Sequence, residues 1–148
     1  MHSRILIFDF GSQYTQLIAR RIRELNIYCD IVPYNHTQAL DNSSYDGIIL
    51  SGSPYSVLQE DALQFPVKET IEKHPVPILG VCYGAQYFAH VFGGKVERSS
   101  KREYGRSHLD YIEPTNKLFQ QISPKSQVWM SHGDSVLELP EGFDLLAT

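Results

Sequence analysis

The sequence has few cysteines, and the two that it contains lie far apart. Cys29 and Cys82 belong to no C-x-x-C motif and have no paired histidines near them. This arrangement excludes a recognisable zinc site and gives no support for a disulfide framework. We therefore expect no metal site in this chain.

Long apolar runs and an excess of positive charge are also missing. No apolar stretch is long enough to span a bilayer, and Met1–Arg4 leads directly into a short apolar run, without the h-region of a secretory signal. Lys and Arg total 13 against 17 Asp and Glu, a formal net charge of −4, which does not favour a nucleic-acid surface. We expect a cytoplasmic protein with neither a membrane nor a nucleic acid as partner.

The length and composition are those of one globular domain. At 148 residues the chain can bury one core and is too short for two ordinary domains. Its hydrophobic share of 42% and charged share of 20% are typical of globular proteins. A single domain over residues 1–148 is therefore expected.

In the first half of the chain, apolar runs alternate with helical patterns. Strands are predicted over Ile5–Phe8, Ile27–Pro33, Gly47–Leu50 and Ile78–Val81. Helices are predicted over about Thr15–Leu25, Ala62–His74 and Tyr83–Phe92, with Pro66 at the start of a regular part. Continuous apolar strands that alternate with helices indicate a parallel sheet covered on both faces. The predicted class is α/β, with a three-layer, open, flavodoxin-like sheet.

After Gly93 the apolar runs become short and are separated by turn residues. These runs predict further strands, some of them antiparallel, which would extend the parallel sheet. The predicted strands are Lys95–Arg98, Ser107–Ile112, Gln127–Met130 and Phe143–Leu146. A brief helical turn is predicted over Leu118–Ile122 and a polar loop over Ser131–Asp134.

Cys82 lies in the motif G-x-C-x-G, between Gly80 and Gly84. Glycines two residues before and two after the central residue let a strand and a helix pass close together, while that residue adopts a strained turn. The motif therefore predicts that Cys82 is a nucleophile. At a helix amino terminus, free amides and the helix dipole are expected to lower the thiol pKa.

Most free cysteines are small buried hydrophobes, which is the alternative for Cys82. The glycine on each side of Cys82 favours the nucleophile, because an ordinary strand-to-helix turn seldom needs both. Cys29 lies inside a predicted strand and is expected to be buried.

Three loops follow the predicted parallel strands: Gly11–Thr15, Ser51–Pro54 and Cys82–Gly84. Open α/β sheets bind ligands at the carboxyl ends of their strands, so these loops are expected to converge. Gly11–Thr15 alone is also compatible with a phosphate cradle like that of flavodoxins, although it has only one glycine.

Four stretches together carry a resemblance to a known family. They are Asp9–Glu24, Ser51–Pro54, Gly80–Gln86 and Trp129–Asp134. They resemble the class I (triad) glutamine amidotransferases, and the resemblance covers the whole chain. It implies that glutamine is hydrolysed to glutamate and ammonia, and that the ammonia passes to a separate ATP-using synthetase domain, on the same polypeptide or on a partner subunit. ATP and Mg²⁺ would belong to that domain, with no cofactor in this one.

The resemblance also implies roles for individual residues. Cys82 would attack the side-chain amide of glutamine to form a glutamyl thioester. Backbone amides of Tyr83 and Ser53 would form the oxyanion hole, with Gly52 shaping the turn. The amino-acid end of the substrate would be held by Gln86, Gly133 and Asp134.

The sequence departs from the family pattern at two places. Ser53 stands where the family usually has a second glycine, which is unfavourable if the turn needs a positive φ. The family's catalytic His and Glu lie in a Q-F-H-P-E segment that would follow Thr148. The resemblance therefore implies an amidotransferase domain that is incomplete at its carboxyl end and inactive by itself, unless a resident histidine such as His132 acts as the base.

Other functions share some of these features. A cysteine hydrolase of γ-glutamyl or peptide bonds would use the same nucleophile turn, and a nucleotide- or flavin-binding module would rely on the Gly11 turn. A non-catalytic interaction domain is the third alternative.

Overall fold

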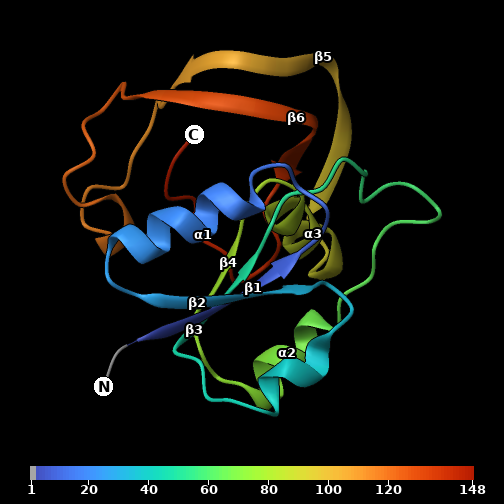
Figure 1. Cartoon of the computed structure of the whole chain (residues 1–148). Coiled ribbons are helices and arrows are strands. Elements are labelled where there is room, and N and C mark those ends of the chain that lie inside the picture. The colour runs from blue at the N-terminus through green and yellow to red at the C-terminus, as the bar shows by residue number, and fades with distance from the viewer. Residues whose placement is uncertain (1–2) are drawn as a thin grey trace. The chain divides into compact units, whose positions relative to one another are not determined.

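The computed structural model describes residues 3–148, except for the side chains of residues 100–104 (Figure 1). Its chain forms two compact units, one ending at Phe88 and the other beginning at Ala89. Met1 and His2, where no secretory signal is expected, lie outside the described residues. Within the described part, no helix is both long and apolar enough to cross a membrane.

A parallel sheet forms the centre of the first unit. Its strands are β1 (Arg4–Asp9), β2 (Tyr28–Pro33), β3 (Gly47–Leu50) and β4 (Ile78–Gly80), in the order β2-β1-β3-β4. All neighbouring strands run parallel. Leu6, Ile7 and Phe8 of β1 are completely buried, as expected for a central strand covered on both faces. The predicted parallel sheet is confirmed.

The helix α1 (Thr15–Glu24) packs on one face of this sheet (Figure 1). Its buried Ala19 packs with Ile7 of β1 and Cys29 of β2 in one apolar cluster. Arg20 and Arg21 lie on the exposed side of the helix and pair with Glu24. The helix therefore buries one apolar stripe and keeps its charges in solvent.

Aromatic side chains cover the other face of the sheet. The ring of Phe8 in β1 lies 4.7 Å from that of Phe65, and the ring of Phe10 lies 5.5 Å from that of Tyr83. Tyr83 opens the helix α3 (Tyr83–Val91) and stacks with Tyr87 one turn later. With α1 on one face and this aromatic layer on the other, the predicted three-layer arrangement is confirmed.

The predicted helix over Ala62–His74 is too long. The helix α2 (Val67–Lys73) begins directly after Pro66, so the prediction that Pro66 precedes the regular part is correct. The preceding segment is instead fixed by side chains of α3: the Tyr83 hydroxyl donates to the Leu63 carbonyl, and the Tyr87 hydroxyl accepts from the Phe65 amide. A short 3₁₀ helix, η1 (Thr37–Leu40), was not predicted.

The second unit contains an antiparallel pair of long strands, β5 (Lys95–His108) and β6 (Gln127–Glu138). The antiparallel extension is therefore confirmed, but its strands are longer than predicted. The predicted polar loop Ser131–Asp134 is wrong, because these residues lie inside β6, where Asp134 pairs with Arg98. Backbone pairing with β5, together with an irregularity between Arg98 and Glu103, accommodates polar residues that by sequence suggest a turn.

Two further strand predictions differ from the structure. β5 ends at His108, so the strand predicted over Ser107–Ile112 does not form as such. The strand predicted over Phe143–Leu146 is replaced by a single bridge between Ile112 and Ala147. The helical turn near Leu118 is the 3₁₀ helix η2 (Lys117–Phe119), which starts where the Asn116 side chain accepts from the Leu118 amide.

Candidate active site

Cys82 connects β4 to α3 through a strained turn. Its φ is +50°, in the left-handed region that is unfavourable for residues other than glycine. The residue directly precedes the first residue of α3, and its side chain is exposed. The strained turn predicted from G-x-C-x-G is therefore present.

The two glycines of this motif are needed because backbones pass very close to them. A Cβ atom at Gly80 would lie 2.6 Å from the amide nitrogen of Ala85. At Gly84 it would lie 2.5 Å from the carbonyl oxygen of Leu50, at the end of β3. Any side chain at either position would push α3 away from the sheet, which would move Cys82.

The loop that follows β3 lies against Cys82. A Cβ atom at Gly52 would lie 3.4 Å from the Cβ of Cys82 and 3.4 Å from the Oγ of Ser12. A Cβ atom at Gly11, on the same loop as Ser12, would lie 3.7 Å from the Cδ of Pro54. The loops that follow β1, β3 and β4 therefore meet around Cys82, as the parallel sheet predicts.

Two backbone amides beside Cys82 remain available to a ligand. The N–H groups of Tyr83 and Ser53 donate no hydrogen bond to another described residue. Ser53 does not adopt a positive φ. The serine that replaces the family's glycine therefore brings no left-handed strain to this loop.

The expected low pKa of the Cys82 thiol is wrong for this structure. Burial raises the pKa of Cys82 above its ordinary value. Although the side chain can be reached by solvent, the protein around it favours the neutral thiol over the charged thiolate. The position of Cys82 before α3 is therefore not accompanied by a lowered thiol pKa, and a base would favour its activation.

The turn after β1 is closed by a carboxylate. Asp9 accepts hydrogen bonds from the Gly11 amide at 2.9 Å and from the Thr15 hydroxyl at 2.8 Å. The Tyr14 amide likewise donates to the Ser12 hydroxyl oxygen at 3.0 Å. Amides that bind a carboxylate and a hydroxyl of their own loop do not suit a phosphate cradle.

The predicted substrate-binding residues fall in both units. Gln86 is buried in α3. Its backbone N–H donates to the Cys82 carbonyl at 3.0 Å, so it lies one helical turn beyond the nucleophile. Gly133 and Asp134 lie in β6 of the second unit, where Asp134 is buried and Gly133 has open space around its Cα. Their roles in binding glutamine stay predictions.

The model of the glutamine amidotransferase class I family matches residues 6–148. The chain belongs to the class I glutamine amidotransferases. It is 54% identical over 148 residues to the glutamine-hydrolysing GMP synthase of Cytophaga hutchinsonii and 57% identical to that of Christiangramia forsetii. It covers 28% of the length of each of these relatives.

Solved structures agree with this family. A Thermoplasma acidophilum protein, provisionally assigned as one chain of a GMP synthase, superposes with a TM-score of 0.87 at 32% identity, over 99% of this chain and 73% of that one. A glutamine amidotransferase from Thermotoga maritima superposes with a TM-score of 0.79 at 25% identity, over 100% of this chain and 67% of that one.

The other cysteine of this amidotransferase chain has a structural position. Cys29 is 2% exposed and packs in the cluster beneath α1, with its Sγ 3.5 Å from the Ala19 carbonyl oxygen. Its predicted burial is confirmed.

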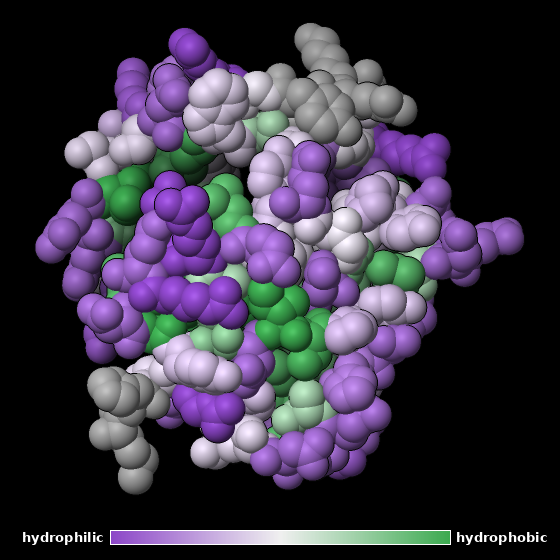
Figure 2. All heavy atoms as spheres, in the orientation of Figure 1, coloured by the Kyte–Doolittle hydropathy of each residue, from purple (hydrophilic) through white to green (hydrophobic). Residues whose placement is uncertain are grey.

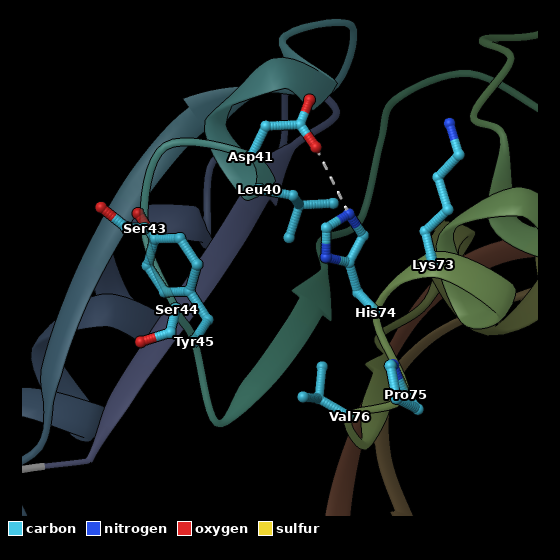
Figure 3. Close-up of a pocket in the computed structure, with 9 residues that line it drawn as sticks. All are labelled: Leu40, Asp41, Ser43, Ser44, Tyr45, Lys73, His74, Pro75 and Val76. Atoms are coloured by element: carbon cyan, nitrogen blue, oxygen red, sulfur yellow. Dashed lines mark ion pairs between the residues drawn. The ribbon is translucent and has the colours of Figure 1, made fainter.

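A separate hollow of about 360 Å³ lies at the opposite end of the sheet, where the chain enters β3 and β4 (Figure 3). His74 points into it and lies 3.8 Å from the Asp41 carboxylate. Cys82 follows the carboxyl end of β4, whereas His74 precedes its amino end. His74 therefore lies at the amino end of β4, the opposite end from Cys82, and cannot act as its base.

The sequence analysis assigned no role to Ser51 or Asp9, which lie beside the Cys82 site. Ser51 is completely buried; its hydroxyl accepts from the Phe10 amide after β1 and donates to the Gly52 carbonyl of its own loop. Both are polar residues that end an apolar strand just before a glycine or near one. A polar side chain at a strand end is the signal that could have identified them.

Proposed function

We propose that this chain is the glutaminase part of a GMP synthase, in which Cys82 hydrolyses glutamine and thereby supplies ammonia. The observation that carries this function is the strained Cys82 turn, with the free amides of Tyr83 and Ser53 beside it. Identity above 50% to GMP synthases over the whole chain supports the same assignment.

The chemistry begins at the Cys82 sulfur. The sulfur attacks the side-chain amide carbon of glutamine, and the carbonyl oxygen becomes an oxyanion that accepts hydrogen bonds from the Tyr83 and Ser53 amides. The thiol proton passes to a base, which returns it to the leaving nitrogen. Ammonia departs and a glutamyl thioester remains on Cys82. Water then adds to the thioester carbonyl, and glutamate leaves.

The raised thiol pKa favours a mechanism in which a base removes the thiol proton. A neutral thiol must lose its proton before or during attack, and burial makes that loss unfavourable in this environment. In the family this base is a histidine oriented by a glutamate, in a segment that follows the region corresponding to this chain. We assign the base of the active enzyme to such a segment.

Ammonia from this reaction would reach a synthetase domain that uses ATP to convert XMP to GMP. Two relatives that are more than 50% identical to this chain are glutamine-hydrolysing GMP synthases, which supports this partner. ATP and Mg²⁺ belong to that domain in our proposal. In the part of this chain that the structure describes, no group of three or more His, Cys, Asp or Glu side chains is arranged to hold a metal ion.

The alternatives are supported less well. Asp9 occupies the turn in which a nucleotide or flavin phosphate would bind, which disfavours a cofactor-binding module. A hydrolase of γ-glutamyl peptides would use the same nucleophile, so substrate choice has to be measured.

The test uses an extended protein, in which residues 1–148 are joined to the segment that follows the matched region in the Cytophaga hutchinsonii relative. We expect it to release glutamate from free glutamine and to leave γ-glutamyl peptides intact. Residues 1–148 alone should be slower by about three orders of magnitude or more, because we assign the base to the added segment.

Two cysteine variants of the extended protein complete the experiment. Cys82→Ala should abolish glutamate release while the circular dichroism spectrum is retained. Cys29→Ala, which removes a thiol outside the site, should keep the activity. Release that persists in Cys82→Ala, or cleavage of γ-glutamyl peptides in preference to glutamine, would refute the proposed function.

A further inference from the structure

We propose that Ser51 is the positioning residue of the oxyanion hole: its hydroxyl holds the Gly52–Ser53 peptide in the orientation that presents the Ser53 N–H to the substrate. This inference rests on the proposed function. The residue lies at the end of β3 and is completely buried. It touches no substrate atom in this assignment and acts through the peptide that follows it.

The two groups bonded to the Ser51 hydroxyl leave its proton only one acceptor. The Phe10 amide lies 2.9 Å from the Ser51 Oγ and can only donate, so the hydroxyl oxygen accepts there. The Gly52 carbonyl oxygen lies 3.0 Å from the same Oγ and can only accept. The single hydroxyl proton of Ser51 is therefore donated to the Gly52 carbonyl.

This bond fixes the peptide that contains the proposed oxyanion donor. The peptide between Gly52 and Ser53 is trans, so its carbonyl and its N–H point in opposite directions. With the Gly52 carbonyl turned inward to Ser51, the Ser53 N–H faces the opposite way, out of the core. Glycine tolerates many backbone conformations, so without the bond this peptide is free to rotate.

Ser51 also bonds to the segment that bears the second donor. Its carbonyl oxygen accepts from the Gly84 amide at 3.2 Å, at the first turn of α3. Gly84 is adjacent to Tyr83, whose N–H is the other proposed oxyanion donor. One buried residue thus fixes the two donor segments relative to each other. Preorganised donors stabilise an oxyanion because they need no reorientation during the reaction.

The experiment compares two variants of the extended protein that each lose one buried hydroxyl. Ser51→Ala removes the bond to Gly52 and leaves the Phe10 amide without its acceptor. Tyr87→Phe is the matched control, because the Tyr87 hydroxyl accepts from the Phe65 amide at 2.9 Å and donates to acceptors of Phe65 and Gln64. For each variant we would measure kcat and KM for glutamine and the rate of Cys82 alkylation by iodoacetamide.

We expect Ser51→Ala to lower kcat by about tenfold to a hundredfold, somewhat less than the loss of a whole oxyanion donor. KM and the alkylation rate should stay close to those of the parent, since alkylation of a thiol forms no oxyanion. Tyr87→Phe should retain the parent kcat. If Ser51→Ala does not fold, Ser51→Cys, which preserves the side-chain size with a weaker donor, should show the same selective loss of kcat.

Three results would overturn the assignment of Ser51: an unchanged kcat in Ser51→Ala, an equal loss in Tyr87→Phe, or a parallel fall in the alkylation rate. In each of these three cases the parent protein still hydrolyses glutamine in a Cys82-dependent way. The absence of that activity from the parent would instead refute the proposed function itself.

Discussion

At Cys82, backbone strain and thiol chemistry have separate causes. The positive φ results from the close crossing of β4 and α3, which glycines on each side permit. The protonation of the thiol depends on its surroundings, and burial holds the pKa of Cys82 above its ordinary value. The turn presents the sulfur, but it does not by itself deprotonate the sulfur.

The raised pKa of Cys82 predicts how the rate of thiol labelling depends on pH in the 148-residue chain. Iodoacetamide reacts with the thiolate, and a raised pKa keeps the thiolate scarce until the pH exceeds the ordinary thiol value of about 8.5. The labelling rate of Cys82 should therefore keep rising from about pH 7 to about pH 10. Peptide mass mapping at each pH measures this rate.

Cys29 serves as the internal control in this experiment. Because it is buried, it should react more slowly than Cys82 in the folded chain. A rate that levels off near neutral pH would show a lowered pKa at Cys82. Faster labelling of Cys29 would contradict the choice of nucleophile.

At the scale of elements, the crossing of β3, β4 and α3 determines where the site can form. Gly84→Ala should destabilise the chain by about 1–3 kcal/mol, because its Cβ would meet the backbone of Leu50, which has little room to move. The change in the free energy of unfolding can be measured by urea denaturation.

Gly47→Ala is the matched control for this prediction. A Cβ atom at Gly47 would meet the flexible end of the Ile5 side chain at 3.0 Å, so a small side-chain movement relieves the contact. Its loss of stability should be smaller. Equal losses in the two variants would show that the tight crossing at Gly84 is not a special constraint.

Elements were predictable from the sequence where apolar patterns are strong. The predicted strand Ile5–Phe8 lies within β1, and the predicted strand Gly47–Leu50 coincides with β3. Both are continuous apolar runs, because the strands are buried on both faces. Length was harder to predict for α2 and β6. Side chains of Tyr83 and Tyr87 hold the residues before α2 outside a helix, and pairing with β5 extends β6 through polar residues. Both effects are long-range contacts that a local pattern does not contain.

At the scale of the whole molecule, the chain has two compact units, and the proposed chemistry lies in the first. Apolar side chains reach the surface between polar ones (Figure 2). Leu79 of the edge strand β4 is 45% exposed, and Trp129 in the second unit is 68% exposed.

Only part of the candidate site could be predicted from the sequence. The glycine-flanked motif and the strand-end loops indicated Cys82 and its neighbours, because those residues are linked by local geometry. The role of Ser51 depends on hydrogen bonds to Phe10 and Gly52 in a folded sheet. The raised thiol pKa depends on burial, which a helix amino terminus in the sequence does not reveal.

The most direct test of the central claim is to trap the glutamyl thioester. The extended protein would be mixed with isotopically labelled glutamine, quenched in acid during turnover and digested for mass mapping. We predict a glutamyl adduct on the peptide that contains Cys82, and no adduct in Cys82→Ala. An adduct on Cys29 or on another residue would contradict the account.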